Sequence, residues 1–214
     1  MKKIIIIGAS GLGREVAWLV ERINKKEITW DLLGFIDDNP VIQGTEINGY
    51  MVLGTTDDVE AFADAYFVCA VGSSKIRKKI IDKINTKAGV KYATVIDPSV
   101  EISDLTKIGE GTIICAHTII TVNIKIGNHV IINYDCTVGH DAVLHDFVTL
   151  YPSVNVSGTT DIGECSELGT GMQIIQGKKV GANSIVGAGA VVVKDIPEKC
   201  TAVGVPAKPI KFFE

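Results

Sequence analysis

No apolar run in the 214-residue sequence is long enough to cross a membrane, since the longest spans only Ala65 to Val71 and the one nearest the N-terminus only Ile4 to Ile7. This run also follows Met1-Lys2-Lys3 too closely to belong to a signal peptide. Basic residues are not in excess: 21 Lys and Arg stand against 25 Asp and Glu, a net charge of −4, which argues against a nucleic-acid-binding surface. We therefore expect a cytoplasmic protein with neither a membrane span nor a nucleic-acid partner.

The cysteines form no C-x-x-C pair, and their odd number of five fits reduced thiols better than a disulfide framework or a zinc site. No metal ion is expected to bind. Each thiol is expected to serve packing rather than chemistry: Cys69, Cys115, Cys136, Cys165 and Cys200.

A six-residue repeat is the most informative feature that the sequence does contain. From Ile96 to Val192 an aliphatic residue recurs at every sixth position without a miss. A short fixed period over nearly a hundred residues is typical of a solenoid, in which each repeat buries its apolar face against its neighbours. Glycine follows the aliphatic residue where a corner needs positive φ or close backbone approach: Gly109, Gly127, Gly139, Gly163, Gly169, Gly181 and Gly187.

The residues before the repeats follow a different pattern. A β-branched run, Lys2 to Ile7, precedes a glycine-rich turn, and apolar residues then recur at helical spacing from Arg14 to Ile23. Alternating strands and helices predict a small parallel sheet with right-handed crossovers. The remaining expected elements are strands at Leu32–Ile36 and Tyr66–Val71 and a helix at Lys75–Ile84.

Three turns of this sheet are candidates for binding a ligand. Ligands of such sheets bind beyond the carboxyl ends of the strands, where backbone N–H groups and helix N-termini attract anions. The first turn reads G-x-x-G-x-G, a weak dinucleotide signal, and its glycines could instead only allow close packing of helix on strand. A nucleotide-linked substrate is the alternative that we favour, held at Ser10-Gly11, Asp37-Asp38 and Gly72-Ser73.

His140 is the strongest candidate for chemistry, and it directly precedes a carboxylate, Asp141. Acyl transfer from a thioester needs a base near neutral pH, and imidazole suits that role. A carboxylate can hold the imidazole in the useful tautomer. The competing interpretation is an ordinary surface histidine at a corner.

The repeat resembles that of the hexapeptide-repeat acyltransferases, which fold as a left-handed parallel β-helix with three hexapeptides per coil. Together with the glycine-rich start, Asp37-Asp38, Gly72, His140-Asp141 and the ending Ala202 to Pro209, the whole chain is similar to the sugar acetyltransferases of UDP-linked 4-amino-sugars. That group includes the sialic acid O-acetyltransferase-like proteins. The resemblance implies a homotrimer with active sites between subunits.

The resemblance also implies a domain organisation. Residues 1–90 would form an α/β Rossmann-like domain that binds the nucleotide sugar, residues 91–198 the β-helix acyltransferase domain, and residues 199–214 a C-terminal tail. Seventeen repeats would give between five and six coils.

Roles for individual residues follow from the same resemblance. His140 would be the general base and Asp141 its partner, while the Gly158 N–H would lie near the thioester oxygen. The nucleotide sugar would be held by Ser10, Gly11, Asp37, Asp38, Gly72 and Asn133. Acetyl-CoA would contact Thr149, Gly158, Thr170 and Ala188.

Two positions depart from the family pattern. Thr149 stands where family members commonly carry a second histidine, which touches the acetyl group. His145 replaces the glycine usual after the aliphatic residue, so either that corner tolerates a Cβ or an imidazole has been placed near the site. Together they leave the identity of the acceptor open.

The expected function is N-acetylation of a UDP-4-amino-4,6-dideoxy sugar with acetyl-CoA, for bacterial glycan biosynthesis. O-acetylation of sialic acid or another glycan sugar remains open, since the same base can serve a hydroxyl. A non-catalytic nucleotide-sugar-binding scaffold is the alternative from another class. A nicotinamide-dependent oxidoreductase is disfavoured, because the small N-terminal domain has no catalytic partner domain except the solenoid.

Overall fold

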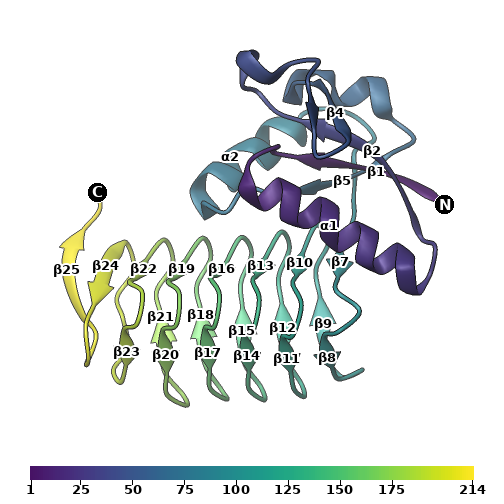
Figure 1. The fold of residues 1–214 in the computed structure, drawn as a ribbon. Helices are drawn as coiled ribbons and strands as arrows, with labels where there is room; N and C mark the ends of the chain where they lie inside the picture. Colours follow the sequence, from purple (N-terminus) through teal and green to yellow (C-terminus); the bar gives the residue numbers. More distant parts are fainter.

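A six-stranded sheet forms the N-terminal part of the computed structural model, which describes residues 1–214 (Figure 1). Its strand order is β3-β4-β2-β1-β5-β6, and all neighbours are parallel except the β3–β4 hairpin. The strands are β1 (Lys2–Ile7), β2 (Trp30–Ile36), β3 (Glu46–Ile47), β4 (Tyr50–Gly54), β5 (Tyr66–Cys69) and β6 (Lys91–Tyr92).

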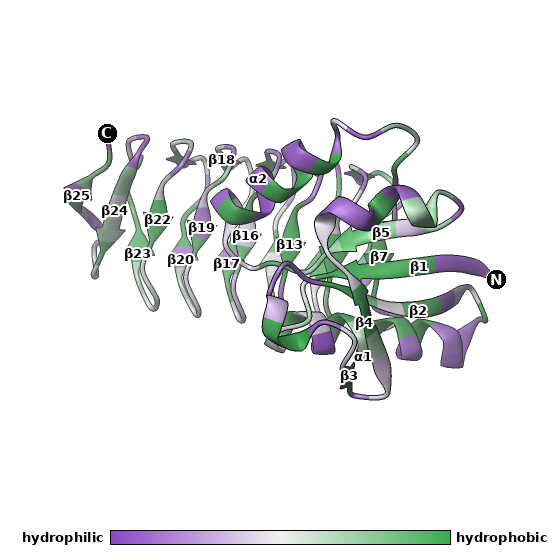
Figure 2. Cartoon of the chain, turned by 90° about the horizontal axis from the view of Figure 1, so that it is seen from above, coloured by the Kyte–Doolittle hydropathy of each residue, from purple (hydrophilic) through white to green (hydrophobic).

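Helices α1 (Gly11–Lys26) and α2 (Ser74–Ile84) cover opposite faces of this sheet. Ile4 and Ile6 pack with α1, whereas Ile5 and Ile7 pack on the α2 side. Strand β1 is therefore apolar on both faces, which explains its unbroken apolar sequence. Figure 2 shows β1 and β5 as apolar strands between the two helices. Two short 3-10 helices, Pro40–Ile42 and Thr56–Phe62, complete the part.

The six-residue repeat forms a three-sided parallel β-helix, as expected. Each register residue from Ile96 to Val192 is the second residue of a two-residue strand, and each strand from β7 to β20 pairs with the strand three further along the chain. The seventeen strands are β7 (Val95–Ile96), β8 (Glu101–Ile102), β9 (Lys107–Ile108), β10 (Ile113–Ile114), β11 (Ile119–Ile120), β12 (Lys125–Ile126), β13 (Ile131–Ile132), β14 (Thr137–Val138), β15 (Val143–Leu144), β16 (Thr149–Leu150), β17 (Asn155–Val156), β18 (Asp161–Ile162), β19 (Glu167–Leu168), β20 (Gln173–Ile174), β21 (Lys179–Val180), β22 (Ile185–Val186) and β23 (Val191–Val192).

The strand pairing defines three faces and three edges. The first face contains β7, β10, β13, β16, β19 and β22, the second runs from β8 to β23, and the third from β9 to β21. Strands β24 (Cys200–Val203) and β25 (Lys208–Phe212) extend the first face, so the C-terminal tail adds a hairpin to the β-helix. We name each edge by the two faces that it joins.

The corners of the β-helix correct one expectation about glycine. None of the seven glycines that follow a register residue has positive φ. They are needed for close approach instead: a Cβ on Gly169 would lie 2.5 Å from the Ala188 backbone nitrogen. Positive φ occurs two residues later, at positions such as Asn123 and Asp141, where asparagine and aspartate tolerate it well.

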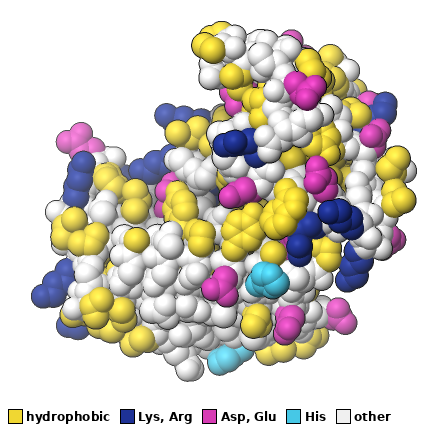
Figure 3. Space-filling view, in the orientation of Figure 1, with side chains coloured by type: hydrophobic (Ala, Val, Ile, Leu, Met, Phe, Trp, Pro, Cys, Tyr) yellow, Lys and Arg dark blue, Asp and Glu magenta, His cyan; other side chains and the backbone are white.

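The N-terminal part lies on the first face and on the two edges that border it. The outward side chains of Val95, Ile113 and Ile131 on this face are 0% exposed and pack in the same cluster as α1. On the second face, by contrast, Ile119 is 43% exposed. In Figure 3, hydrophobic side chains gather where the two parts meet. No helix of the chain has the length and apolarity needed to cross a membrane.

Candidate active site

The glycine-rich turn joins β1 to α1 at the carboxyl edge of the sheet. Ser10 is the N-cap of α1, yet its side chain makes no capping bond, so the first N–H groups of the helix are open. A Cβ on Gly13 would collide with the Gly8 carbonyl, which assigns Gly13 to close helix packing. A Cβ on Gly11 would meet nothing closer than Arg14, at 4.0 Å. The fold therefore does not require glycine at position 11.

Asp37 and Asp38 end β2 and turn in different directions. Asp37 Oδ2 accepts a bond from Ala9 N at 2.9 Å, which ties it to the glycine-rich turn. Asp38 instead accepts bonds from Thr56 N at 2.7 Å and Thr56 Oγ1 at 2.9 Å. Asp38 therefore holds the start of the 3-10 helix, and Asp37 is the residue adjacent to the glycine turn.

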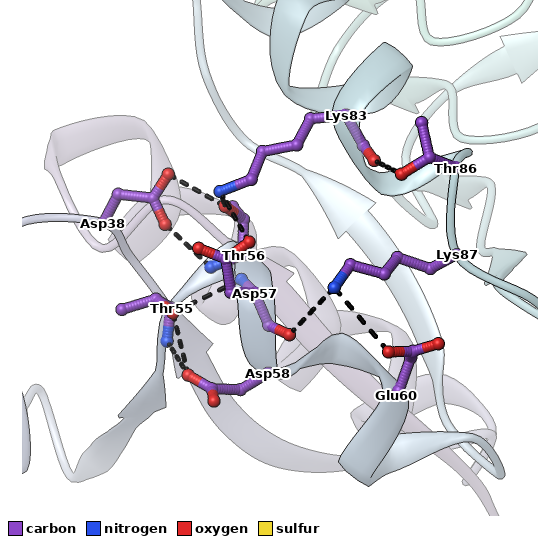
Figure 4. Close-up of polar contacts among 9 residues, drawn as sticks. All are labelled: Asp38, Thr55, Thr56, Asp57, Asp58, Glu60, Lys83, Thr86 and Lys87. Carbon is purple, nitrogen blue, oxygen red and sulfur yellow. Dashed lines mark hydrogen bonds and ion pairs between the residues drawn. The ribbon is translucent and has the colours of Figure 1, made fainter.

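Charged residues brace this 3-10 helix from α2, as Figure 4 shows. Lys83 Nζ donates to Thr56 Oγ1 at 2.8 Å and lies 3.0 Å from Asp57 Oδ1. Its pKa is raised, first by its bond to Asp57. Asp58 completes a capping box with Thr55 at the start of the helix.

A cavity of about 270 Å³ opens beside these residues. Gly8, Asp37, Asp38, Thr56 and Val71 contribute to its wall, and Ile76 and Ile80 of α2 close its apolar side. Its walls thus come from the carboxyl ends of β1, β2 and β5, where a nucleotide is expected.

The Gly72 turn lies against the β-helix. A Cβ on Gly72 would lie 3.9 Å from the Tyr151 hydroxyl, in ordinary contact. The Gly72 carbonyl accepts a bond from Thr149 Oγ1 at 2.9 Å, and Thr149 is 0% exposed on the first face. This location does not support the expected contact of Thr149 with acetyl-CoA, because its hydroxyl is buried between the two parts of the chain.

Asn133 lies on the first–second edge and is 7% exposed. Its side-chain amide donates to the Leu150 carbonyl at 2.9 Å. Tyr151 occupies the same corner position one coil later, so Asn133 and the Gly72 turn lie at the same edge.

His140 and Asp141 form an exposed pair on the second–third edge, between β14 and β15. His140 Nδ1 lies 2.9 Å from Asp141 Oδ2, and both side chains are 51% exposed. The bond from His140 lowers the pKa of Asp141, and Asn123, one coil earlier, lowers it further. The carboxylate therefore stays ionised and can fix the proton on Nδ1, leaving Nε2 free to accept one.

Gly158 lies one coil after His140 on the same edge. A Cβ at this position would lie 2.5 Å from His140 Nε2, so the imidazole occupies the space that a side chain would need. The Gly158 N–H donates to no protein atom. A free N–H beside a histidine can stabilise a developing oxyanion.

Thr170 and Ala188 lie on the first–second edge, with the second face between them and His140. Within one chain, the expected site residues therefore separate into two groups. His140, Asp141 and Gly158 form one group, and the residues expected to bind acetyl-CoA at Thr170 and Ala188 lie on the opposite side of the second face.

His145 lies on the third–first edge, whereas His140 lies on the second–third edge. His145 Nε2 is 3.0 Å from Asp161 Oδ1, and both side chains are exposed. That corner tolerates a Cβ, which decides between the two explanations left open by the sequence. No group of three or more His, Cys, Asp or Glu side chains is arranged to hold a metal ion.

Sequence analysis missed the polar residues that join the two parts. Arg77 and Glu167 each bond to residues of the other part. Arg77 belongs to a Lys-rich segment whose composition is typical of a solvent-exposed helix, and Glu167 occupies an outward strand position. Neither position carries a local signal of burial.

Comparison with known proteins identifies the family. The sequence profile of the PglD N-terminal domain matches residues 3–84. The acetyltransferase domain of PglB from Neisseria gonorrhoeae, solved with acetyl coenzyme A, is 35% identical, with a TM-score of 0.89 over 98% of this chain and 99% of that one. The chain belongs to the hexapeptide-repeat sugar acetyltransferases.

Two other solved structures have the same architecture. WeeI from Acinetobacter baumannii is 32% identical, with a TM-score of 0.85 over 97% of this chain and 99% of that one. A mutant perosamine N-acetyltransferase from Caulobacter crescentus, solved with CoA and GDP-perosamine, is 29% identical, with a TM-score of 0.89 over 98% and 97%. The β-helix of this family is left-handed, as the resemblance implied.

One curated sequence also matches, an uncharacterized protein of Acanthamoeba polyphaga mimivirus that is 30% identical over 98 residues. The match covers 46% of this chain and only 19% of that protein.

Proposed function

We propose that this sugar acetyltransferase transfers the acetyl group of acetyl-CoA to the amine of a nucleotide-linked 4-amino-sugar. The observation that carries the proposal is the His140–Asp141 pair, 2.9 Å apart, beside the unpaired Gly158 N–H. An open cavity at the Asp37 turn supports an acceptor that binds through a nucleotide moiety. The relatives with bound acetyl coenzyme A, or with CoA and GDP-perosamine, support the same pair of substrates.

The proposed mechanism gives His140, Asp141 and Gly158 separate roles. His140 Nε2 accepts a proton from the amine as its nitrogen attacks the thioester carbonyl. The Gly158 N–H donates to the oxygen that gains negative charge. Collapse of the tetrahedral intermediate breaks the C–S bond, and the imidazolium returns the proton to the CoA thiolate. Asp141 keeps the imidazole in the required tautomer throughout.

We further propose a homotrimer in which neighbouring subunits share each site. The nucleotide turn, Thr170 and Ala188 would come from one chain, and His140 and Gly158 from the next. Exposed apolar side chains support this arrangement, because they gather along the edge that carries the base: Val122, Ile175 and Val193, with Ile119 on the adjoining second face. Burying such side chains favours association. Free, buried thiols fit a reducing compartment such as the cytoplasm.

Release of free CoA thiol from acetyl-CoA, measured against a panel of acceptors, tests the function. The panel contains UDP- and GDP-linked 4-amino-sugars, the corresponding 4-hydroxy sugars and free sialic acids. Amine-dependent release is expected, and release only with hydroxyl acceptors would replace N- by O-acetylation. Nucleotide binding without any thiol release would support a non-catalytic scaffold instead.

His145→Ala provides a matched control for His140→Ala. Both histidines are exposed corner residues paired with an aspartate, but only His140 adjoins the Gly158 N–H. We expect His140→Ala to lower kcat by about 10²–10⁴-fold and His145→Ala to leave it unchanged. Equal effects of the two changes would remove His140 from the mechanism.

The two substrate regions are tested by steric changes. Gly11→Val should raise KM for the nucleotide sugar, because the added side chain would cover the open N–H groups of α1. Ala188→Trp should instead raise KM for acetyl-CoA. The reverse pattern would contradict these assignments.

A further inference from the structure

Arg77 is completely buried, although it carries a positive charge on a helix that is otherwise rich in exposed lysine. No carboxylate accepts a bond from its guanidinium; almost all of its acceptors are backbone carbonyls. Burial of this unpaired charge lowers its pKa to about 10. A buried charge requires its hydrogen bonds, so the surrounding carbonyls are held in a fixed arrangement.

The guanidinium joins segments that are far apart in the sequence. Nη1 donates to the Val71 carbonyl at 2.6 Å and to the Gly72 carbonyl at 3.0 Å. Nε donates to the His129 carbonyl at 2.9 Å, and Nη2 to the Phe147 carbonyl at 2.7 Å. One side chain therefore connects the turn after β5 with two successive coils of the β-helix.

We propose that Arg77 is a positioning residue, which fixes the Val71–Gly72 turn on the β-helix so that the turn is already in place for the nucleotide sugar. The proposal rests on the proposed function, in which this turn borders the acceptor cavity. Val71 itself lines that cavity. Because the turn is already ordered, binding of the nucleotide sugar does not have to offset the entropy cost of ordering it.

A second contact fixes the other end of the same turn. Glu167 of β19 accepts bonds from Ser74 N at 2.8 Å and Ser74 Oγ at 2.9 Å. The Tyr151 hydroxyl donates to the same carboxylate at 3.2 Å. The turn is thus held at both ends by the β-helix, and Val71 faces the cavity.

Arginine is chemically suited to this role in a way that lysine is not. Its planar guanidinium presents five N–H donors in a fixed geometry, which allows bonds to carbonyls on three sides. A lysine ammonium keeps the charge but cannot reach the carbonyls of Gly72, His129 and Phe147 together. Arg77→Lys therefore loosens the turn without removing the charge.

Arg22→Lys is the matched control. Arg22 also joins the two parts, through bonds of 2.6 and 3.0 Å to the carboxylate of Asp97, but it touches no cavity residue. We expect both variants to unfold at a lower temperature than wild type. Only Arg77→Lys should raise KM for the nucleotide sugar, by about tenfold, with kcat and KM for acetyl-CoA within about twofold of wild type.

Thr149→Val is a second variant that leaves Arg77 in place. It removes the hydroxyl that donates to the Gly72 carbonyl and accepts from Arg77 Nη2 at 2.9 Å. A rise of about threefold in the same KM is expected, since one neutral bond to the turn is lost. Binding of UDP or GDP, measured by calorimetry, gives a readout that does not depend on turnover. Arg77→Lys and Thr149→Val should both weaken this binding.

The proposal is overturned if wild type turns over and neither variant raises KM for the sugar, or if Arg22→Lys raises it equally. Wild type that binds a nucleotide but transfers no acetyl group would contradict the proposed function alone, and nucleotide affinity would then decide the role of Arg77. Wild type that binds neither nucleotide would overturn both.

Discussion

A single glycine decides where the His140 imidazole can lie. The imidazole occupies the space that a side chain at Gly158 would need, and the Gly158 N–H donates to no protein atom. The same residue thus provides room for the base and a donor for the oxyanion. Two requirements of acyl transfer meet at a position without a side chain.

Gly158→Ala should therefore impair catalysis while leaving the fold intact. The new Cβ would lie 2.5 Å from His140 Nε2, and the exposed imidazole can swing away to relieve the overlap. A displacement of this kind is expected to lower kcat by about 10²-fold. Steady-state kinetics together with thermal unfolding test this expectation. Wild-type kcat in a folded variant would contradict it.

His129 makes the stability of the protein dependent on pH. It is 3% exposed, its Nδ1 has no partner, and its ring stacks on Phe147. Burial lowers its pKa from 6.5 to about 4; nearby Arg77 lowers it further, whereas Asp146 and Asp82 raise it. The unfolded chain binds the proton more readily, so the neutral ring stabilises the fold above about pH 6.5, and this contribution is lost as the pH falls toward 4.

His129→Phe should flatten the pH dependence of stability. Phenylalanine is acceptable at this corner position, because Phe147 occupies it one coil later with φ of 61°. Wild type should lose up to about 3 kcal/mol between pH 7 and pH 4 through this one group. Denaturant unfolding of both proteins at several pH values measures the difference. Parallel curves for the two proteins would rule out His129 as the source.

At the scale of the elements, corner glycines fall into two kinds with opposite tolerance. Gly169→Ala should cost about 1–3 kcal/mol, because the Cβ would lie 2.5 Å from the Ala188 nitrogen of the next coil. Gly189→Asn should stay within about 1 kcal/mol of wild type, since φ is 66° there and no atom lies within 4 Å of an added Cβ. Chemical denaturation of both variants checks this order, and equal losses would contradict it.

The sequence predicts the strands of the β-helix better than it predicts the contacts between the β-helix and the N-terminal part. An aliphatic side chain every sixth residue must point inward, so each strand from Ile96 onward follows from local pattern alone. Thr149 points outward, and its burial depends on the placement of α2, which no local signal specifies. For the same reason the sequence identified the His140–Asp141 pair, but it did not predict that Thr170 lies on a different edge of the β-helix from this pair. The β3–β4 hairpin was also missed, because its strands are short and partly exposed.

At the scale of the whole molecule, the proposed trimer predicts complementation between inactive subunits. A chain with Gly11→Val keeps the base, and a chain with His140→Ala keeps the nucleotide turn. In trimers of random composition about a quarter of the sites would combine the two intact halves. Co-expression with different tags, purification of mixed trimers and assay at low nucleotide sugar measure the recovery. Mixed trimers without activity would place the whole site within one chain.

Strands of the β-helix that are three places apart in the chain share a face. Each hexapeptide therefore advances the chain by one face around the β-helix axis. Insertion of one hexapeptide after Ile162 would keep an aliphatic residue at every inward position, yet turn all later coils by about a third of a revolution. Thr170 and Ala188 would then move to the edge of their own chain's His140. Length changes compatible with activity must therefore come in whole coils, even where stability would tolerate smaller steps. The number of hexapeptides between His140 and Thr170 is therefore constrained by catalysis more than by folding.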